Sequence, residues 1–225
     1  MIKKHLPNIL TCANLLTGCV GVVHAFKGNL KLMVFFVLAC SIFDFFFCFF
    51  ARILNVKSDI GKELDSLADV ISFGFLPSVL FYQLLLQNHE SPDWLPYFGF
   101  FIIVFSALRL AKFNIDSRQS ENFIGLNTPT NAFFVVSLPY LIADFEFVSK
   151  PYFLLVLILV LSYLLVSNIK LFSLKLCSTS WQANKYKYIF LICSAVSLSF
   201  LMFAAVPIIL ILYFVFSQLH FKYQT

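Results

Sequence analysis

Long apolar runs follow one another along almost the whole chain, and only short polar segments separate them. A run of about 20 apolar residues has the length of a helix that crosses the hydrocarbon core of a bilayer. Sixty per cent of the 225 residues are hydrophobic and only 12% are charged, which is far from the balance of a soluble domain. The sequence therefore predicts an all-α integral membrane protein, because a helix satisfies its own backbone hydrogen bonds in lipid.

The apolar runs predict about eight transmembrane helices in a single membrane domain over residues 1–225. Within it we distinguish only a core over 1–147, which contains the motifs described below, and additional C-terminal spans over 148–225. Ser58 or Asp59 is the expected N-cap of the third helix, because short polar side chains accept the free N–H groups of a first turn. The predicted spans are 7–26, 31–54, 63–87, 94–112, 129–147, 151–169, 186–201 and 204–219.

The net charge of +5 comes from basic residues in the short connections between these runs. If the N-terminus is cytoplasmic, only Lys27, Lys31 and Lys150 of the sixteen Lys and Arg residues lie on the outer side. An excess of basic residues on the cytoplasmic side orients membrane proteins. Membrane topology therefore explains the charge, and we expect no nucleic-acid partner.

Ionisable residues gather where the second predicted span ends and the third begins. Asp44 and Arg52 lie eight residues apart, a little over two helical turns, so they share one helix face. Gly61, Asp65 and Asp69 follow at steps of four and line one face of the next helix. Charged residues at membrane depth usually mark functional sites. Two facing helices would bring three carboxylates together, which indicates a site for a hard divalent cation and a phosphate.

The same stretch resembles the pattern of the CDP-alcohol phosphatidyltransferase family, D-x-x-D-G-x-x-A-R, eight residues, then G-x-x-x-D-x-x-x-D. Phe47 and Cys48 stand where the pattern has its second Asp and its first Gly. Phe cannot coordinate a hard cation, and a thiol is a soft ligand that suits Mg²⁺ poorly. We therefore expect weaker metal binding than a complete site would give. The positions in register are Asp44, Ala51, Arg52, Gly61, Asp65 and Asp69.

This resemblance implies displacement at phosphorus, in which an alcohol attacks the phosphatidyl group of a CDP-linked lipid and CMP leaves. It implies that Asp69 is the catalytic base that takes the proton of the alcohol. Ala51 and Gly61 would leave room for the nucleotide, and Arg52 would pair with a phosphate or with one of the aspartates. The residues expected to hold Mg²⁺ or Mn²⁺ are Asp44, Asp65 and Asp69.

Further stretches resemble the bacterial phosphatidylserine synthases within this family, and together they favour serine as the accepting alcohol. The resemblance covers about the first 140 residues, whereas the last three predicted spans are apolar and little more. The stretches are PNILTCANLLTG (7–18), GKELDSLADVISFG (61–74), LRLAKFNID (108–116) and FIGLNTPTNA (123–132).

Polar residues in two of these stretches are candidates for substrate binding. Arg109 and Lys112, at the cytoplasmic end of the fourth span, could meet the serine carboxylate or substrate phosphates, or anchor the helix to anionic headgroups. Asn8 and Thr11 lie with Asn14 on one face of the first span. They could hydrogen-bond the nucleotide or pack against other helices.

We therefore expect the chain to transfer the phosphatidyl group from CDP-diacylglycerol to L-serine, which gives phosphatidylserine and CMP in phospholipid biosynthesis. The expected location is the inner membrane of a bacterium, with the active site on the cytoplasmic side, and the resemblance suggests a homodimer. Two alternatives stay open. One is a phosphatidyltransferase that uses another alcohol, such as glycerol 3-phosphate. The other is a catalytically silent, lipid-binding relative, for which Phe47 and Cys48 are the best argument.

Overall fold

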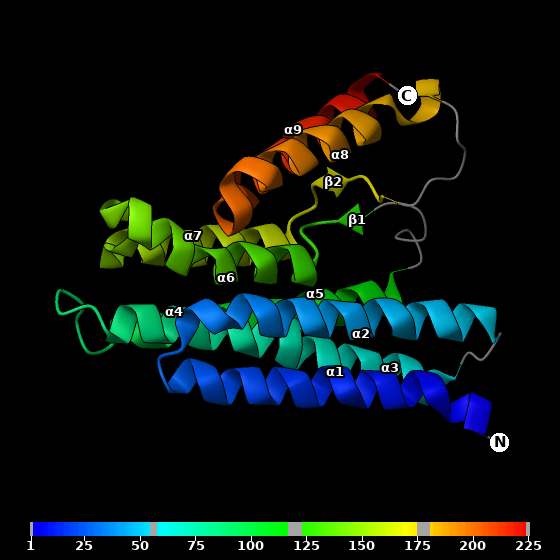
Figure 1. Cartoon of the computed structure of the whole chain (residues 1–225), viewed down its shortest axis with the longest axis horizontal. Coiled ribbons are helices and arrows are strands. Elements are labelled where there is room, and N and C mark those ends of the chain that lie inside the picture. Colours follow the sequence, from blue (N-terminus) through cyan, green and yellow to red (C-terminus); the bar gives the residue numbers. More distant parts are fainter. Residues whose placement is uncertain (1, 55–57, 117–122, 175–180, 224–225) are drawn as a thin grey trace.

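Helices make up nearly all of the structure, a computed structural model that describes residues 2–54, 58–116, 123–174 and 181–223 (Figure 1). The main helices are α1 (Ile2–Phe26), α2 (Met33–Ile53), α3 (Asp59–Asp69), α4 (Leu76–Leu86), α5 (Phe101–Ile115), α6 (Thr128–Asp144), α7 (Pro151–Val166), α8 (Trp181–Leu201) and α9 (Val206–Tyr223). Short helical turns precede or join them, namely η1 (Leu30–Leu32), η2 (Val70–Phe75), η3 (Leu95–Phe100), η5 (Glu146–Ser149) and η6 (Met202–Ala205).

The predicted all-α membrane fold is confirmed, whereas the number of eight spans stays a prediction. Five helical segments among the described residues are long and apolar enough to cross a membrane. The last of them contains α8 and α9, which pack against each other as a hairpin (Figure 1). Helix α7 is apolar but shorter. The five segments are Leu6–Phe26, Leu30–Ile53, Asp59–Leu86, Leu95–Ile115 and Asn184–Tyr223.

The structure differs from the predicted boundaries at several helix ends. The third helical segment begins at Asp59, ahead of the predicted start, because Ser58 caps it: its Oγ accepts the N–H of Gly61 at 3.0 Å. The fifth predicted span ran to 147 and the sixth to 169, but α6 ends at Asp144 and α7 ends at Val166. Polar residues interrupt the apolar runs in both places: Asp144 and Glu146 at the end of α6, and Ser167 and Asn168 after α7.

A small antiparallel sheet that the sequence did not predict follows α7. Strand β2 (Lys170–Leu171) pairs with β1 (Phe123–Ile124), with Phe123 opposite Leu171. Two-residue strands are too short to show the alternation of apolar and polar residues by which a strand is recognised. The pairing places the chain that follows α7 next to the chain that precedes α6.

The helices form layers in which α6 is central (Figure 1). Helix α1 packs along α2 and also contacts α3, η2 and α4, while α5 packs against η2 and α7. Helix α6 contacts α2 and α4 on one side and α9 on the other. The first helices and the α8–α9 hairpin therefore lie on opposite sides of α6. The start of α1, the end of α2, the start of α3 and the end of α9 lie toward the same end of the bundle (Figure 1).

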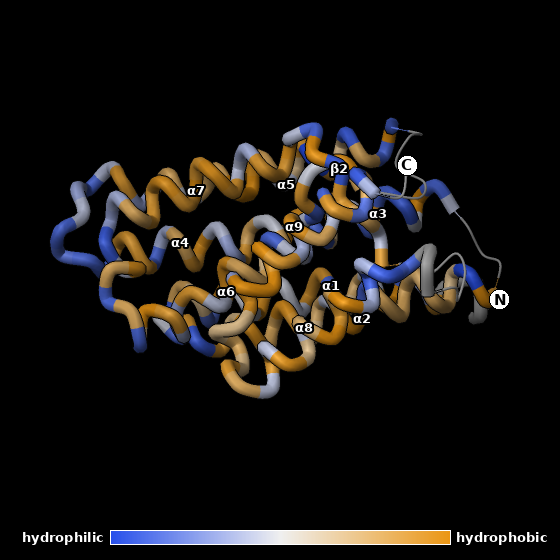
Figure 2. The backbone as a smooth tube through the Cα atoms, turned by 90° about the horizontal axis from the view of Figure 1, so that it is seen from above, coloured by the Kyte–Doolittle hydropathy of each residue, from blue (hydrophilic) through white to orange (hydrophobic). Residues whose placement is uncertain are grey.

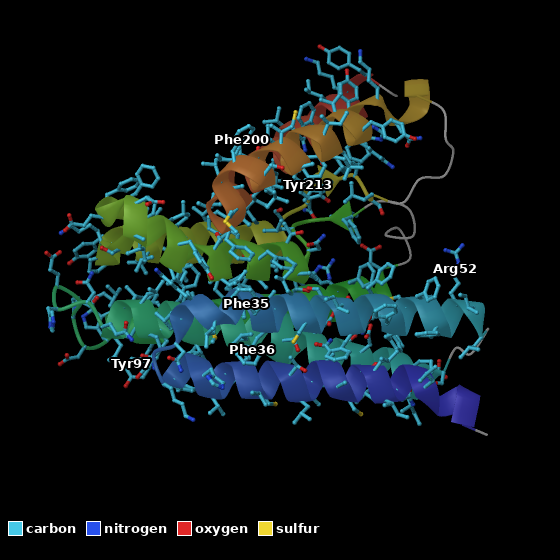
Figure 3. The ribbon with its side chains drawn as sticks, in the orientation of Figure 1. Phe35, Phe36, Arg52, Tyr97, Phe200 and Tyr213 are labelled. Atoms are coloured by element: carbon cyan, nitrogen blue, oxygen red, sulfur yellow. The ribbon has the colours of Figure 1, made fainter. Side chains whose placement is uncertain are left out.

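Apolar side chains cover much of the outer surface as well as the core. Phe73, Phe81 and Phe172 are fully buried, whereas Phe200 on α8 is 82% exposed (Figure 3). Figure 2 shows apolar residues along the helices and hydrophilic residues gathered in connections at the ends of the molecule. A surface of this kind is unfavourable in water and suits contact with lipid.

Helix α1 approaches the helical run from α3 to α4 at the π-helical turn η2, which begins directly after Asp69. A Cβ atom on Gly18 would lie 2.5 Å from Ser72 Oγ and 3.1 Å from Ser72 Cα. The hydroxyl of Ser72 donates to the backbone oxygen of Asn14 at 3.2 Å. Gly18 is therefore required for the contact between α1 and η2. Single π-helical turns are frequent at functional sites.

The contact between Gly18 and Ser72 leads to a prediction about stability. Gly18→Ala should lower the thermal unfolding midpoint in detergent, because the steric cost of overpacking, about 1–3 kcal/mol, exceeds the helix propensity that alanine adds. Ser72→Ala alone should cost about 1 kcal/mol for the lost hydrogen bond. In the double variant the loss from Gly18→Ala should be smaller, because the nearest clashing atom is gone. Strictly additive losses would contradict the contact.

Candidate active site

Three aspartates from α2 and α3 come together inside the bundle. One carboxylate oxygen each of Asp44, Asp65 and Asp69 lies within 4.8 Å of one from each of the others. The spacing in the sequence predicted this meeting, because Asp65 and Asp69 are one turn apart on α3 and Asp44 lies on the helix that precedes it. The proximity is confirmed, while the roles of the three residues stay predictions.

The donor set of this cluster fits a divalent cation. Asp44 and Asp65 are partly buried, and Asp65 Oδ1 is buried without a hydrogen-bond partner. Three neighbouring carboxylates repel one another, most strongly where water is excluded. Mg²⁺ and Mn²⁺ favour carboxylate oxygens. A divalent cation bound here would offset the repulsion and satisfy the unpaired oxygen of Asp65.

Asn14 is a cluster neighbour whose role the sequence did not predict. It is fully buried on α1, and its Nδ2 donates to Asp69 Oδ1 at 3.5 Å. The only signal in the sequence was its position on the same helix face as Asn8 and Thr11. That position does not reveal that the face would meet Asp69, because the meeting depends on how α1 packs against α3.

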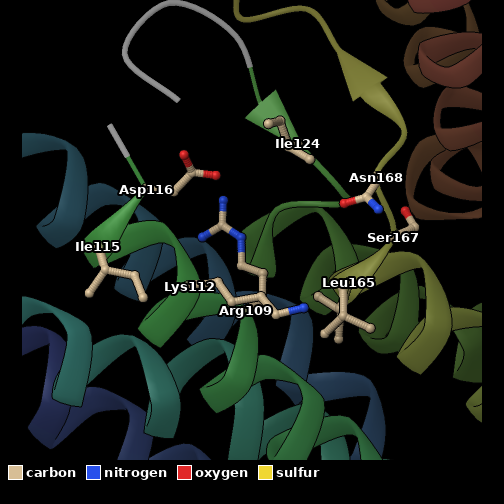
Figure 4. Close-up of a pocket in the computed structure, with 9 residues that line it drawn as sticks. Arg109, Lys112, Ile115, Asp116, Ile124, Leu165, Ser167 and Asn168 are labelled. Atoms are coloured by element: carbon tan, nitrogen blue, oxygen red, sulfur yellow. The ribbon is translucent and has the colours of Figure 1, made fainter. Parts of the chain in front are cut away.

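Arg109 and Lys112 on α5 line a cavity of about 400 Å³ beside the cluster (Figure 4). Lys112 is exposed. Arg109 is only 6% exposed, its guanidinium lies 4.9 Å from the ring centre of Phe113, and it is close enough to Asp69 for an electrostatic interaction. Arg109 Nε has no hydrogen-bond partner. A buried arginine of this kind is ready to bind an anionic group.

Besides these two cationic side chains, the cavity is lined by a carboxylate, that of Asp116, and by the amide of Asn168. Figure 4 shows the guanidinium of Arg109 with Asp116 on one side and Asn168 on the other. The remaining lining comes from the end of α5, from strand β1 and from the end of α7 with the residue after it. Its residues are Ile115, Ile124, Leu165, Val166 and Ser167.

Hydrogen bonds join the helix of the aspartates to the end of α5. The ammonium group of Lys62 donates to the backbone oxygen of Asn114 at 2.9 Å. The side-chain amide of Asn114 donates to Ser66 Oγ at 2.8 Å. Lys62 lies on α3 ahead of Asp65, and Ser66 lies between Asp65 and Asp69, so these bonds hold the helix of the two aspartates beside the last turn of α5.

Two predicted residues on α1 approach the start of α3. Asn8 is partly buried, and its Oδ1 would lie 3.1 Å from a Cβ atom on the buried Gly61. Gly61 thus permits close approach of α1, in addition to any space it leaves for a nucleotide. Thr11 is buried and its hydroxyl donates to the backbone oxygen of Pro7 at 3.3 Å.

The predicted residues at the end of α2 lie apart from the cluster. Ala51 is partly buried, and Arg52 is exposed in the last turn of the helix (Figure 3). Within the described part of the chain, Arg52 forms no ion pair with the three aspartates. The expectation of such a pair is therefore not met in this structure, because the side chain extends into the surroundings; pairing with a phosphate remains the other expectation. Phe47 is partly buried and Cys48 is exposed.

Comparison with known proteins identifies the family. Residues 4–165 match the model described as CDP-alcohol phosphatidyltransferase. The CDP-diacylglycerol–serine O-phosphatidyltransferase of Bacillus subtilis is 34% identical over 171 residues, which cover 74% of this chain and 89% of that protein. The protein of the same name from Helicobacter pylori is 32% identical over 168 residues, covering 73% of this chain and 70% of that protein.

A relative from an archaeon is similar over the same length. The archaetidylserine synthase of Methanothermobacter thermautotrophicus is 29% identical over 168 residues, covering 73% of this chain and 68% of that protein. The region matched by the family model contains the three aspartates, Asn14 and Arg109, whereas α8 and α9 lie beyond it. The family model covers well over half of the chain, and the chain therefore belongs to the CDP-alcohol phosphatidyltransferase family.

Proposed function

We propose that this protein transfers the phosphatidyl group of CDP-diacylglycerol to the hydroxyl of L-serine and releases CMP. The observation that supports it best is the cluster of three carboxylates beside a cavity that contains both cationic and anionic side chains. The names of the relatives from Bacillus subtilis and Helicobacter pylori support the same reaction. The bond formed joins the serine oxygen to phosphorus, and the bond broken joins phosphorus to the CMP oxygen.

Divalent cations are generally required in this family, and we propose Asp44, Asp65 and Asp69 as the residues that would hold Mg²⁺ or Mn²⁺. When bound, such ions neutralise charge on the pyrophosphate and on the departing CMP. Asp69 would accept the proton of the serine hydroxyl as its oxygen attacks phosphorus. Arg109, within electrostatic reach of Asp69, would bind an anionic group next to this base.

The cavity beside the cluster favours serine over glycerol 3-phosphate. Serine carries a carboxylate and an ammonium group, so a site for it needs a cation and an anion. Arg109 and Lys112 supply the cationic side, and Asp116 supplies a carboxylate on the same cavity wall. Glycerol 3-phosphate has no ammonium group, so it would make no use of a carboxylate at this position. We therefore assign this cavity to the amino-acid substrate.

The nucleotide and the membrane complete the proposal. We assign Asn8, Thr11, Ala51 and Gly61 to the nucleotide side of the site, and Arg52, exposed at the end of α2, to a substrate phosphate. The proposed location is the inner membrane of a bacterium, with the site on the cytoplasmic side and the chain in a homodimer. The single membrane domain remains part of this proposal.

Phe47 supports a second candidate function, that of a catalytically silent, lipid-binding relative. It occupies the position of a carboxylate in the family pattern and has no atom that can coordinate a hard cation. The three remaining carboxylates are nevertheless close together, which favours a metal site of reduced affinity over a lost one. Activity measurements separate the two functions.

The first prediction concerns serine-dependent release of CMP by the purified protein in detergent, titrated with Mn²⁺ and Mg²⁺. We expect activity in the native sequence and in Phe47→Asp/Cys48→Gly. The double variant should reach half-maximal rate at a roughly 10–100-fold lower metal concentration, because it regains a carboxylate ligand. Competition between serine and glycerol 3-phosphate in the same assay identifies the preferred alcohol.

Each other outcome of this assay has a distinct meaning. Activity confined to the double variant would support the silent relative with an otherwise intact site. If both proteins fail to release CMP while the double variant is folded and binds CDP-diacylglycerol, the serine-transferase proposal is wrong.

A second prediction concerns Asp116. Asp116→Asn should raise the KM for serine about 10–100-fold, because a hydrogen bond to a charged group contributes about 1.5–3 kcal/mol. The KM for CDP-diacylglycerol should stay nearly unchanged. Asp144→Asn, the same change at an exposed position at the end of α6, is the matched control. An equal rise of both KM values in Asp116→Asn would show that the residue does not select serine.

A further inference from the structure

Asn14 is held in place by groups from two other helices. Its backbone oxygen accepts a hydrogen bond from Cys40 Sγ on α2 at 3.5 Å and one from Ser72 Oγ on η2 at 3.2 Å. Gly18, one turn further along α1, allows the close approach to Ser72. Asn14 therefore has a fixed position between the two helical segments that carry the aspartates.

The side chain of Asn14 is only half satisfied by the protein. Its Nδ2 donates to Asp69 Oδ1, but its Oδ1 is buried and has no hydrogen-bond partner. Asp65 Oδ1 is in the same condition. A buried oxygen without a partner is costly. The two residues are linked through Asp69, which accepts from Asn14 and has a carboxylate oxygen within 4.8 Å of one of Asp65. A cation held by the cluster is the kind of group that both unpaired oxygens require.

An amide oxygen is a suitable ligand for the cations that the carboxylates favour, because Mg²⁺ and related hard ions bind carboxylate, amide and water oxygens. Phe47 leaves the cluster with one carboxylate fewer than the family pattern. Asn14 reaches the cluster from a third helix and offers an oxygen donor without adding negative charge. Its N–H group meanwhile orients the carboxylate of Asp69.

We infer that Asn14 completes the cation site of this protein: its amide N–H positions Asp69, and its amide oxygen is a ligand for the divalent cation beside Asp44 and Asp65. This inference rests on the proposed metal binding of the cluster, and it does not depend on which alcohol accepts the phosphatidyl group. It adds α1 to the two helices that supply the aspartates.

Binding of Mn²⁺ alone tests the inference, measured in detergent without substrates from the electron paramagnetic resonance signal of free Mn²⁺. Asn14→Ala should weaken Mn²⁺ binding about 10–100-fold, as the loss of groups around a metal does. Asn14→Asp should bind at least as tightly as the native protein, because it keeps an oxygen and adds the charge that Phe47 omits. Asn88→Ala, which removes another asparagine hydrogen bond, to the backbone oxygen of Ser149 at 2.8 Å, should have no effect.

Unchanged Mn²⁺ affinity in Asn14→Ala would overturn the inference. Equal weakening of Mn²⁺ binding in Asn14→Ala and Asn14→Asp, with both variants as thermally stable as the native protein, would also overturn it. The side-chain oxygen at position 14 would then not contribute to binding. If Asn14→Ala does not fold, Mn²⁺ binding by Asn14→Asp that is weaker than in the native protein would overturn the inference. Asp65→Asn separates the inference from the proposed function: it should abolish Mn²⁺ binding if the cluster is the cation site. Native Mn²⁺ binding without serine-dependent CMP release would contradict the function and leave the inference standing.

Discussion

Three like charges within 4.8 Å of one another, inside a bundle with an apolar exterior, are the constraint that the surrounding structure must meet. Repulsion between carboxylates grows as water is excluded, and moving each of them out of water is itself unfavourable. Positive charge and hydrogen-bond donors must therefore lie nearby. Arg109, the amide of Asn14 and the cation that we propose are the compensating groups, and they approach the cluster from different directions.

Close helix packing gives these groups their positions. Gly18 lets α1 contact η2 at Ser72, and Gly61 lets the start of α3 approach Asn8. Toward α5, the hydrogen bonds of Lys62 and Asn114 hold α3 beside the last turn of that helix. The site thus depends on small residues where the backbones of two helices approach each other. It also depends on hydrogen bonds between polar groups near the helix ends. Both devices are common where helices associate in lipid.

The sequence predicted the cluster well because helical periodicity is a local property. Steps of four place Asp65 and Asp69 on one face, and the preceding apolar run places Asp44 on a neighbouring helix. The role of Asn14 was not predictable in this way, since its contact with Asp69 joins residues far apart in the chain. The cavity around Arg109 could not be predicted from the sequence either. Its far wall comes from the end of α7 and from the strand before α6, and nothing in the local sequence pairs those segments.

The sequence by itself determined the membrane-embedded helical fold, the face on which each aspartate lies and the resemblance to a family of phosphatidyltransferases. Hydrophobic run length and the helical repeat are sufficient for these, because each depends on residues within a few turns of one another. Only the tertiary structure decided that Arg52 extends away from the aspartates, that Asn14 contacts Asp69, and that Asp116 shares a cavity with Arg109. Those outcomes depend on how whole helices pack and where each one ends, which is fixed by contacts between distant segments of the chain.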